Sequence, residues 1–433
     1  MQSRARRLVI AYLVVLAAVN LCVYNYANLY ALLHPASDIR LNLYGDPQIE
    51  GDAKISREPR IGKYDILFND YYLHHIYEST IAAFRPHYVV TMGDIFSCQW
   101  ISKEEYYRRI HRFKWISHQV DSKNRSLSGN HIYYHIAGNH DIGYGEETEP
   151  YHINRYTNNF GPLSREWLSR IGDSTHRFAI LNAMNLDKTR RIQYRQQAWQ
   201  FVHQLVAERR ERPDIPLILF SHIPLHKHAG ACVASPSIKY HKGFVVYQDY
   251  LSPATSAYLL HCLAPTFVLS GHDHNGCQAA HSVKTSASQA IPLGMTDKSL
   301  RSSEDLCSLT LEEIDEFQAE IEEFARQTVM PATGFDDVGT SAWDTLEVTV
   351  RSAMGEFGGA AGVFDIRATD HSRQPSPQRH ARTFGRIVAA RANGYEYQYR
   401  EVLLGNHLGI RVLLVVDLVS CLVVPAVLLL LKL

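Results

Sequence analysis

The sequence predicts an α/β layered domain that is flanked by a membrane-spanning helix at each end. Between residues 39 and about 399, short strand-like runs alternate with helical patterns, which is the signature of an α/β fold. The two ends of the chain instead carry apolar runs that are long enough to cross a bilayer. The 433 residues include 44 basic and 44 acidic side chains, and this balance argues against a disordered tail protein and against a nucleic-acid partner.

The N-terminal segment, residues 1–34, is expected to be a short cytosolic end followed by a transmembrane anchor. After three arginines, residues 8–24 are apolar except for Tyr12 and Asn20. Because basic residues precede this run and few follow it, the positive-inside rule places the N-terminus in the cytosol and the body of the protein in a lumen. A cleaved signal peptide is the alternative, but no clear small-residue cleavage site follows, so a retained anchor is favoured.

The C-terminal run, residues 412–431, is almost entirely valine and leucine and predicts a second transmembrane helix that returns to the cytosol. Asp417 lies inside this run. Because an ionised carboxylate at the bilayer centre costs at least about 2.5 kcal/mol, we expect Asp417 near the lumenal interface. A removable GPI-attachment tail is the alternative, but the preceding segment is rich in arginine and lacks the pattern of such a cleavage site.

The body, residues 39–366, is expected to form strands that end in polar residues, with helices between them. The strand-like runs are residues 40–45, 87–92, 132–136, 216–220 and 266–270, and two later runs, 345–350 and 363–366, are expected to return to the sheet. Apolar residues at helical spacing occupy residues 67–84, 103–119, 193–212 and 253–262. In such folds the polar groups at the carboxyl ends of the strands converge on one rim, which is the usual ligand site.

Two stretches look like additions to this core. An acidic helical insertion at about residues 285–341 includes apolar residues at helical spacing, and we expect a helix packed on the body, with a partner-binding arm as the alternative. Residues 367–411 are rich in arginine and serine and contain Pro375 and Pro377. They are expected to form a flexible loop and a juxtamembrane segment.

Five short motifs at the strand ends contain the candidate metal ligands. They are Gly45-Asp46-Pro47-Gln48, Gly93-Asp94, Gly138-Asn139-His140-Asp141, Ser221-His222 and Gly271-His272-Asp273-His274. A single motif of this kind carries little information, because a lone histidine at a strand end is usually structural, but five in this order favour a common site. Oxygen and imidazole ligands suit Mn²⁺, Fe and Zn²⁺, and an aspartate can bridge two ions about 3.5–4 Å apart. The motifs therefore predict a pair of divalent cations.

The order of these motifs resembles that of the calcineurin-like metallophosphoesterase superfamily, over roughly residues 41–275. The resemblance implies a four-layer αββα sandwich, between two transmembrane helices here, and a metal-dependent phosphoric ester hydrolase. Carried over position by position, the family pattern makes Asp46 and His274 ligands of the first metal. It makes Asn139, His222 and His272 ligands of the second metal. Asp94 would be the carboxylate that bridges the two. His140 would act beside the substrate, where it can protonate the leaving oxygen, with Asp141 orienting its ring.

Two positions near these motifs leave alternatives open. Gln48 stands where the family pattern has a histidine, and because an amide oxygen is a weaker ligand for Zn²⁺ than imidazole, the change favours Mn²⁺ or Mg²⁺ at a site that Gln48 helps to form. A weakened site in a non-catalytic protein is the alternative, which we disfavour because the other ligands are present. Lys227 follows the fourth motif and is expected either to contact phosphate or to lie in a solvated loop.

A finer resemblance concerns the sequences that surround His222 and His274. Together with Asp46-Pro47-Gln48 and the two spans, they are similar to the endoplasmic-reticulum branch that removes ethanolamine phosphate from a mannose of GPI anchors. This resemblance implies a lumenal, Mn²⁺-dependent phosphodiesterase with GPI-anchored proteins or their glycolipid as substrate, acting in the reticulum membrane or also in the Golgi, and export machinery as a further partner. Another lumenal phosphoesterase, for a lipid or a nucleotide, and a non-catalytic cargo adaptor are the alternatives.

A lumenal body would permit glycosylation and disulfide formation. Asn124 begins an N-glycan acceptor sequence. Five cysteines lie outside the spans, and because the number is odd, at least one stays unpaired. Cys232 follows His222, and Cys277 follows His274. A disulfide between the two cysteines would join the two metal-bearing loops, and two free thiols are the alternative.

Overall fold

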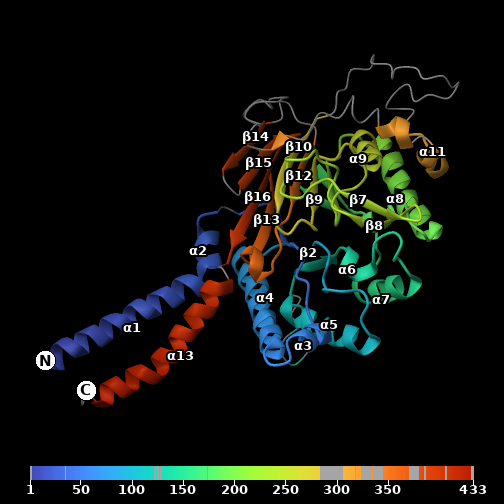
Figure 1. Cartoon of the computed structure of the whole chain (residues 1–433). Helices are drawn as coiled ribbons and strands as arrows, with labels where there is room; N and C mark the ends of the chain where they lie inside the picture. The colour runs from blue at the N-terminus through green and yellow to red at the C-terminus, as the bar shows by residue number, and fades with distance from the viewer. Residues whose placement is uncertain are drawn as a thin grey trace.

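Two mixed β-sheets form the centre of the computed structural model (Figure 1). The structure describes residues 2–34, 36–120, 123, 126, 129–172, 174–282, 306–316, 318–322, 333–334, 345–369, 380–384, 387–404 and 407–430. In spatial order, the first sheet consists of β14 (His380–Phe384), β15 (Ile387–Ala392), β16 (Tyr395–Leu403), β13 (Ala360–Ala368), β1 (Ile39–Tyr44), β2 (Tyr88–Thr91) and β3 (Ile132–His135). Strands β1, β2 and β3 are parallel to one another, and β13 runs antiparallel to β1.

The second sheet also has a parallel centre and antiparallel edges. Its strands, in spatial order, are β11 (Thr333–Gly334), β10 (Cys277–His281), β12 (Thr345–Thr349), β9 (Phe267–Ser270), β6 (Leu217–Ser221), β5 (Ser174–Ile180) and β4 (Arg165–Ile171). Strands β12, β9, β6 and β5 are parallel, and a separate hairpin is formed by β7 (Ile238–His241) and β8 (Phe244–Gln248). In both sheets, the polar motifs follow the carboxyl ends of the parallel central strands.

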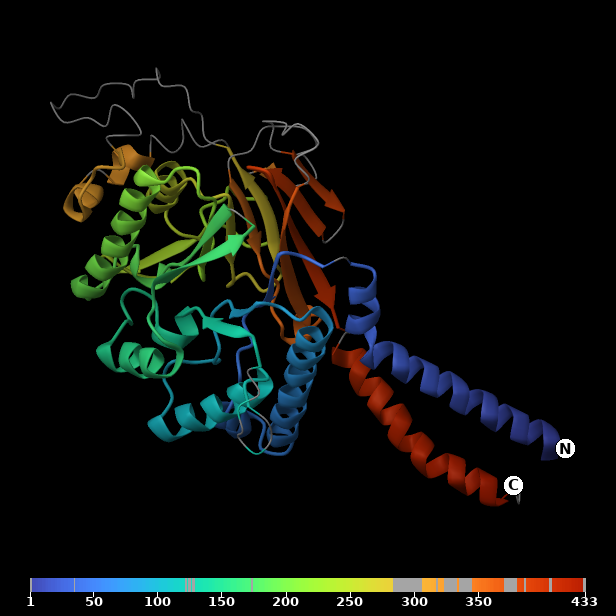
Figure 2. The ribbon, with the colours of Figure 1, turned by 180° about the vertical axis from the view of Figure 1, so that it is seen from behind.

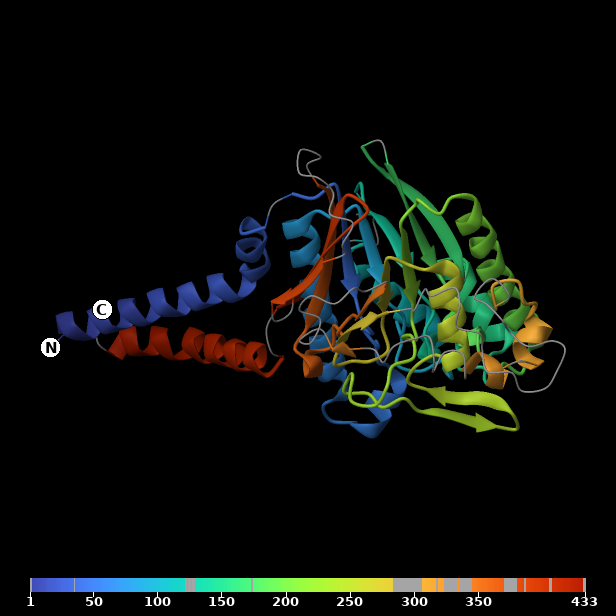
Figure 3. The same ribbon diagram turned by 90° about the horizontal axis from the view of Figure 1, so that it is seen from above.

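An apolar core fills the space between the two sheets. Leu41, Val90, Phe178, Phe220 and Phe364 are among its members, and all are fully buried. Because alternate residues of a strand point to opposite faces, the remaining apolar side chains pack against helices on the outer faces. Figure 3 shows α4 (Gly62–Phe84) outside the first sheet and α8 (Ile192–Glu211) outside the second. The predicted four-layer αββα sandwich is confirmed.

The helix ends follow from local sequence signals. Ser102 caps α5 (Lys103–Ile116) by accepting a hydrogen bond from the amide of Glu105, and Ser252 caps α9 (Pro253–Tyr258) in the same way. Helix α4 ends where Arg85 adopts a left-handed conformation, one residue before a proline. Other helices in the described part of the chain include α2 (Tyr26–Leu32), α3 (Asp52–Arg57), α6 (Asn139–Ile142), α7 (Pro150–Phe160), the π-helix Leu259–Leu263, α11 (Leu311–Glu316) and the 3₁₀ turns η1 (Ala183–Asn185) and η4 (Gly355–Phe357).

Two long apolar helices project together from one side of the domain (Figures 1 and 2). They are α1 (Gln2–Tyr24) and α13 (His407–Leu430), and both are long and apolar enough to span a bilayer. Asn20 of α1 donates a hydrogen bond of 2.9 Å to the carboxylate of Asp417, and Tyr12 pairs with Ser420. The polar residues within the two spans thus face one another, and Asp417 has a hydrogen-bond partner on α1.

Where the structure describes residues 367–411, they form strands and the start of the C-terminal helix rather than the predicted loop. Strands β15 and β16 lie in this range, joined by a turn in which Asn393 and Gly394 both have positive φ, the combination that favours a tight hairpin. Tyr395, Tyr397 and Tyr399 then alternate onto the inter-sheet core. The prediction was wrong because it gave weight to arginine content over this period-two pattern. Pro375 and Pro377 lie outside the described residues.

Most of the predicted acidic insertion, 285–341, also lies outside the described residues. Within its described part, Leu311 and Ile314 of α11 are buried, and Asp315 accepts a hydrogen bond of 2.7 Å from Lys188. A disulfide joins Cys307 to Cys262, a pair that sequence analysis did not identify. The described part of the insertion is therefore fastened to the body.

Candidate metal centre

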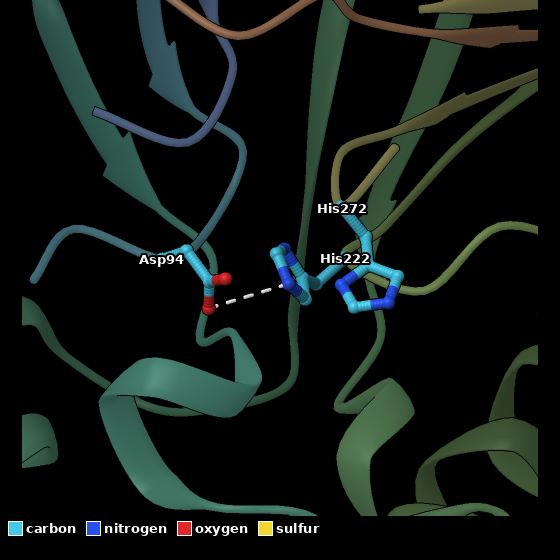
Figure 4. Close-up of side chains that lie close together, drawn as sticks. All are labelled: Asp94, His222 and His272. Atoms are coloured by element: carbon cyan, nitrogen blue, oxygen red, sulfur yellow. Dashed lines mark ion pairs between the residues drawn. The ribbon is translucent and has the colours of Figure 1, made fainter. Parts of the chain in front are cut away.

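The predicted ligands meet at one rim because each follows a strand of the parallel centres. Asp46 and Asp94 follow β1 and β2 of the first sheet, and His222 and His272 follow β6 and β9 of the second. Figure 4 shows Asp94, His222 and His272 facing one another across this rim. The five motifs, separated by more than 200 residues of chain, therefore contribute to a single site.

Two groups of ligand atoms converge at the rim. Asp94, His222 and His272 form one group, and Asp46, Asp94 and His274 form the other; within each group the ligand atoms lie within 4.8 Å of one another. Asp94 belongs to both groups. Asn139 joins the first through its side-chain oxygen, which lies 3.2 Å from Nε2 of His222. The geometry thus offers two adjacent cation sites with one carboxylate between them.

Hydrogen bonds fix the two imidazole rings in orientations that suit metal binding. Nδ1 of His222 donates to the carbonyl oxygen of Met92 at 2.8 Å, which leaves Nε2 directed at Asp94 and Asn139. Nε2 of His272 donates to the carbonyl oxygen of Gln248 at 2.9 Å, which leaves its Nδ1 as the ligand atom. Such bonds to the second ring nitrogen set the tautomer of a metal-binding histidine. Buried carboxylates and imidazole nitrogens that are directed into the same site together fit divalent cations.

The backbone at the site is unusual in two respects. Asp46, Asp94 and His272 all adopt positive φ angles, of 40°, 47° and 71°, which non-glycine residues rarely do and which concentrate at functional sites. The two glycines beside them allow close approach, because a Cβ on Gly93 would lie 2.2 Å from Nδ1 of His222 and one on Gly138 would lie 2.2 Å from Oδ1 of Asp94. These backbone conformations and the two glycines thus let the candidate ligands lie close together.

The buried carboxylates at the rim are stabilised by nearby positive charge. Burial raises the pKa of Asp46 well above its ordinary value, and the charge of Asp94 adds to this effect. Burial also disfavours ionised Asp94, but the neighbouring His222 and His140 outweigh it and hold the pKa of Asp94 below its ordinary value. The pKa of His222 is raised to about 9: burial opposes this shift, and the two carboxylates cause it. A divalent cation would supply the same neutralising charge more effectively than a proton.

Gln48 lies within the group that contains Asp94 and His274. Its side-chain amide is 3.2 Å from Nε2 of His274 and 3.4 Å from Oδ2 of Asp94. Phe357 of η4 packs edge-on against the ring of His274, with 4.9 Å between the ring centroids. Gln48 therefore lies beside two candidate ligands, its own role as a ligand stays a prediction, and a turn from the second half of the chain supports His274.

His140 and Asp141 are placed differently from one another. The main-chain amide of His140 donates to Oδ1 of Asp94 at 2.8 Å, and its partly exposed ring reaches to within 3.8 Å of the same carboxylate. Asp141 is buried and accepts hydrogen bonds from the amides of Ile95, Phe96 and Gly138. Its carboxylate thus braces the loops that carry Asp94 and Asn139, and a role in orienting the His140 ring stays a prediction.

A disulfide joins Cys232 to Cys277, the pair considered from the sequence. Cys277 opens β10 just after His274, and Cys232 lies in the segment that follows His222, so the bond links two loops that carry candidate ligands. Cys98 is the unpaired cysteine of the body. Asn124 lies outside the described residues.

A cavity of about 500 Å³ extends from the candidate metal centre toward the start of α13. Gln48 and His274 of the candidate metal centre and Arg411 near the start of α13 are among the residues that line it. Its walls come from α4, α5, η4 and the segment after β1, including Asn69, Asp70, Arg112, Glu356 and Phe357. The strand-end motifs did not point to these wall residues, because they come from helices and a turn with no short motif of their own.

Comparison with known proteins agrees with this geometry. The profile of the calcineurin-like phosphoesterase family matches residues 44–276, more than half of the chain. An uncharacterized protein of Schizosaccharomyces pombe is 32% identical over 273 residues, which cover 54% of this chain and 62% of that protein. Protein TED1 of Saccharomyces cerevisiae is 26% identical (58% and 67% covered), and metallophosphoesterase 1 of Rattus norvegicus is 26% identical (50% and 57%). The matches thus span between 57% and 67% of these relatives' length.

Proposed function

The chain belongs to the calcineurin-like phosphoesterase family, and on that basis we propose that it is a dinuclear-metal phosphodiesterase of the endoplasmic-reticulum membrane. We further propose that its substrate is the ethanolamine phosphate on a mannose of GPI anchors, whose removal promotes export of GPI-anchored proteins. The observation that carries the catalytic part of the proposal is the sharing of Asp94 between two ligand groups. One carboxylate shared by two cation sites would hold the two cations close together, as two-metal hydrolysis needs.

The chemistry divides between the cations and the residues around them. When bound, two divalent cations activate water and neutralise the phosphoryl oxygens. Asp94 would hold both sites in register, and the bond from His222 to Met92 keeps the lone pair of Nε2 directed inward. The partly exposed ring of His140 stands beside Asp94 and can donate a proton to the leaving alkoxide, which matters most for a diester of an ordinary alcohol.

The membrane and lumenal parts of the proposal rest on three observations. Two helices are long and apolar enough to span a bilayer. The body carries two disulfides, which persist in the oxidising lumen and are rare in the cytosol. The sequences around His222 and His274 are similar to the branch that remodels GPI anchors. Mn²⁺ is the proposed metal, because an amide at position 48 replaces an imidazole that would favour Zn²⁺.

Mass spectrometry of GPI glycans tests the substrate. Cells that lack the protein are expected to accumulate GPI anchors with one additional ethanolamine phosphate, and wild-type protein should reverse this, whereas Asp94→Ala should not. Unchanged glycans, with retained hydrolysis of model diesters by the purified protein, would assign another phosphoric ester as substrate. Rescue by Asp94→Ala at equal abundance would instead favour a non-catalytic adaptor.

Metal competition tests the role of Gln48. We expect Gln48→His to shift metal content from Mn²⁺ toward Zn²⁺ when metal-free protein is reconstituted with equal concentrations of both ions, because an imidazole nitrogen then replaces an amide oxygen. Elemental analysis measures the ratio of bound metals. Gln278→His on β10, outside the candidate ligands, serves as the matched control and should leave the ratio unchanged. An unchanged ratio in Gln48→His would remove Gln48 from the ligand set.

A further inference from the structure

We propose that α4 lies in the lumenal headgroup layer of the membrane, seats the catalytic domain there, and so opens the cavity to a phosphodiester attached to a lipid of the same bilayer. The outer face of α4 would thus be covered by phospholipid. The seating itself is independent of the catalytic assignment, whereas the choice of a lipid-attached diester rests on the proposed phosphodiesterase function.

Helix α4 makes contact with the ends of both spans. Arg411, near the start of α13, forms an ion pair with Asp65 and lies over the ring of Phe68 at 4.6 Å. Two turns further along α4, His75 packs edge-on against Tyr24, the last residue of α1, at 5.5 Å. Figure 3 shows α4 on the side of the domain from which α1 and α13 depart. The helix therefore crosses the ends of both spans, at the level where they would enter the bilayer.

The outer face of α4 is apolar over its first three turns, before the exposed Glu78 on the same face, where a soluble domain would have polar residues. Tyr64, Leu67 and Tyr71, here called the outer stripe, are 73%, 54% and 60% exposed. Their spacing of three and four places them on one face, away from the buried Leu73 and Ile76. Tyrosine with an aliphatic neighbour is typical of helices that lie in the membrane interface.

The outer stripe is continuous with the contacts to the spans. Tyr64 directly precedes Asp65, and Leu67 directly precedes Phe68, so each is turned by only about 100° from a residue that touches α13. Leu29, Leu32 and Leu33, in and just after α2, are also exposed, and α2 packs beside α4 next to the end of α1. A bilayer that holds both spans would therefore also contact the outer stripe. This continuity is the reason for choosing lipid, rather than a protein partner, as what covers the stripe.

The opposite side of α4 lines the cavity. Ile66, Asn69 and Asp70 form part of its wall, together with Arg411 at the entry of α13. The cavity then reaches Gln48 and His274 at the candidate metal centre. One helix thus separates the proposed lipid surface from the substrate cavity, and a diester on a lipid-attached glycan could reach the metals without its anchor leaving the bilayer.

Fluorescence quenching in nanodiscs tests the seating of α4. The full chain, with Cys22, Cys98 and Cys421 replaced by alanine, receives a single environment-sensitive label at Leu67→Cys or Tyr71→Cys. Leu168→Cys on β4, where the native side chain is 52% exposed, is the matched control. Lipids with nitroxide at the headgroup should quench labels at positions 67 and 71 strongly and the label at 168 weakly. Equal quenching at all three positions would overturn the seating.

Paired activity assays test the access route. The double variant Tyr64→Glu/Tyr71→Glu is expected to slow hydrolysis of a GPI glycolipid in the nanodisc about tenfold. The two carboxylates weaken the binding of α4 to the headgroup layer, and a loss of about 1.4 kcal/mol of binding free energy corresponds to a factor of ten. Hydrolysis of soluble bis(p-nitrophenyl) phosphate should stay at the wild-type rate, and Leu168→Glu should change neither. Equal loss on both substrates, or no loss on either, would overturn the access route. If wild-type protein hydrolyses neither substrate, the proposed function fails, and quenching alone decides the seating.

Discussion

Replacing Asp94 by alanine is expected to lower phosphodiester hydrolysis by roughly a thousandfold or more and to release bound metal. Asp94 alone belongs to both ligand groups found among the described residues, so its loss affects both cation sites together. Metal-ion stabilisation of the transition state is worth several kcal/mol, and each 1.36 kcal/mol corresponds to a factor of ten in rate. Elemental analysis and hydrolysis of a chromogenic diester measure the two effects.

A matched control separates metal loss from the loss of any buried carboxylate. Asp187 is also buried, and it accepts hydrogen bonds from Ser252 and Thr255 at the start of α9. Asp187→Ala should lower stability while the folded protein keeps its metal content. Retention of two metals and of wild-type hydrolysis by folded Asp94→Ala would contradict the two-cation centre.

The candidate ligands could be predicted because their signal is local. Each belongs to a short motif that begins with a glycine or a serine at a strand end, and the parallel strands of both sheets bring these ends together. Asp46, Asp94 and His222 therefore lie where the motifs indicated. The strands β15 and β16 carried an equally local signal, the turn at Asn393 and Gly394, but it was masked by the arginine-rich composition around it.

The rest of the site could not be predicted because its partners are distant in the chain. Asn69 and Arg411 line the cavity but lie on helices α4 and α13, far in the sequence from any strand-end motif. Lys227 shows the same difficulty. Its sequence neighbours suggested phosphate contact or solvent, but the side chain is buried and lies 2.8 Å from Glu347, 120 residues away.

Glu347→Ala is expected to lower the free energy of unfolding by about 3–5 kcal/mol, because it leaves the charge of Lys227 buried without its partner. Glu347 is fully buried and forms an ion pair with Lys227. It also accepts hydrogen bonds from the amide of Leu225 at 2.9 Å and from the hydroxyl of Ser270 at 3.3 Å. It thus joins the segments that carry His222 and His272. Denaturant unfolding of the full chain in detergent measures the change.

Two further variants show whether the buried pair is the cause. Lys227→Met combined with Glu347→Leu should recover much of the lost stability, because a buried ion pair can be replaced by apolar residues of similar volume at little cost. Glu396→Ala removes a surface carboxylate that faces Arg391 and should change the free energy of unfolding by less than about 1 kcal/mol. A double variant as unstable as Glu347→Ala alone would contradict the explanation.

The pH dependence of the Glu347→Ala deficit has a defined sign. Burial acts to raise the pKa of Glu347, but Lys227 and His281 outweigh it and lower the pKa from 4.5 to about 2. Because the folded-state pKa lies below the unfolded value, the carboxylate contributes its full stability above pH 4.5 and loses it as the pH falls toward 2. The difference in unfolding free energy between wild type and Glu347→Ala should therefore be constant near neutral pH and shrink below pH 4.5. A difference that grew on acidification would show that Glu347 is not held as a carboxylate in the folded protein.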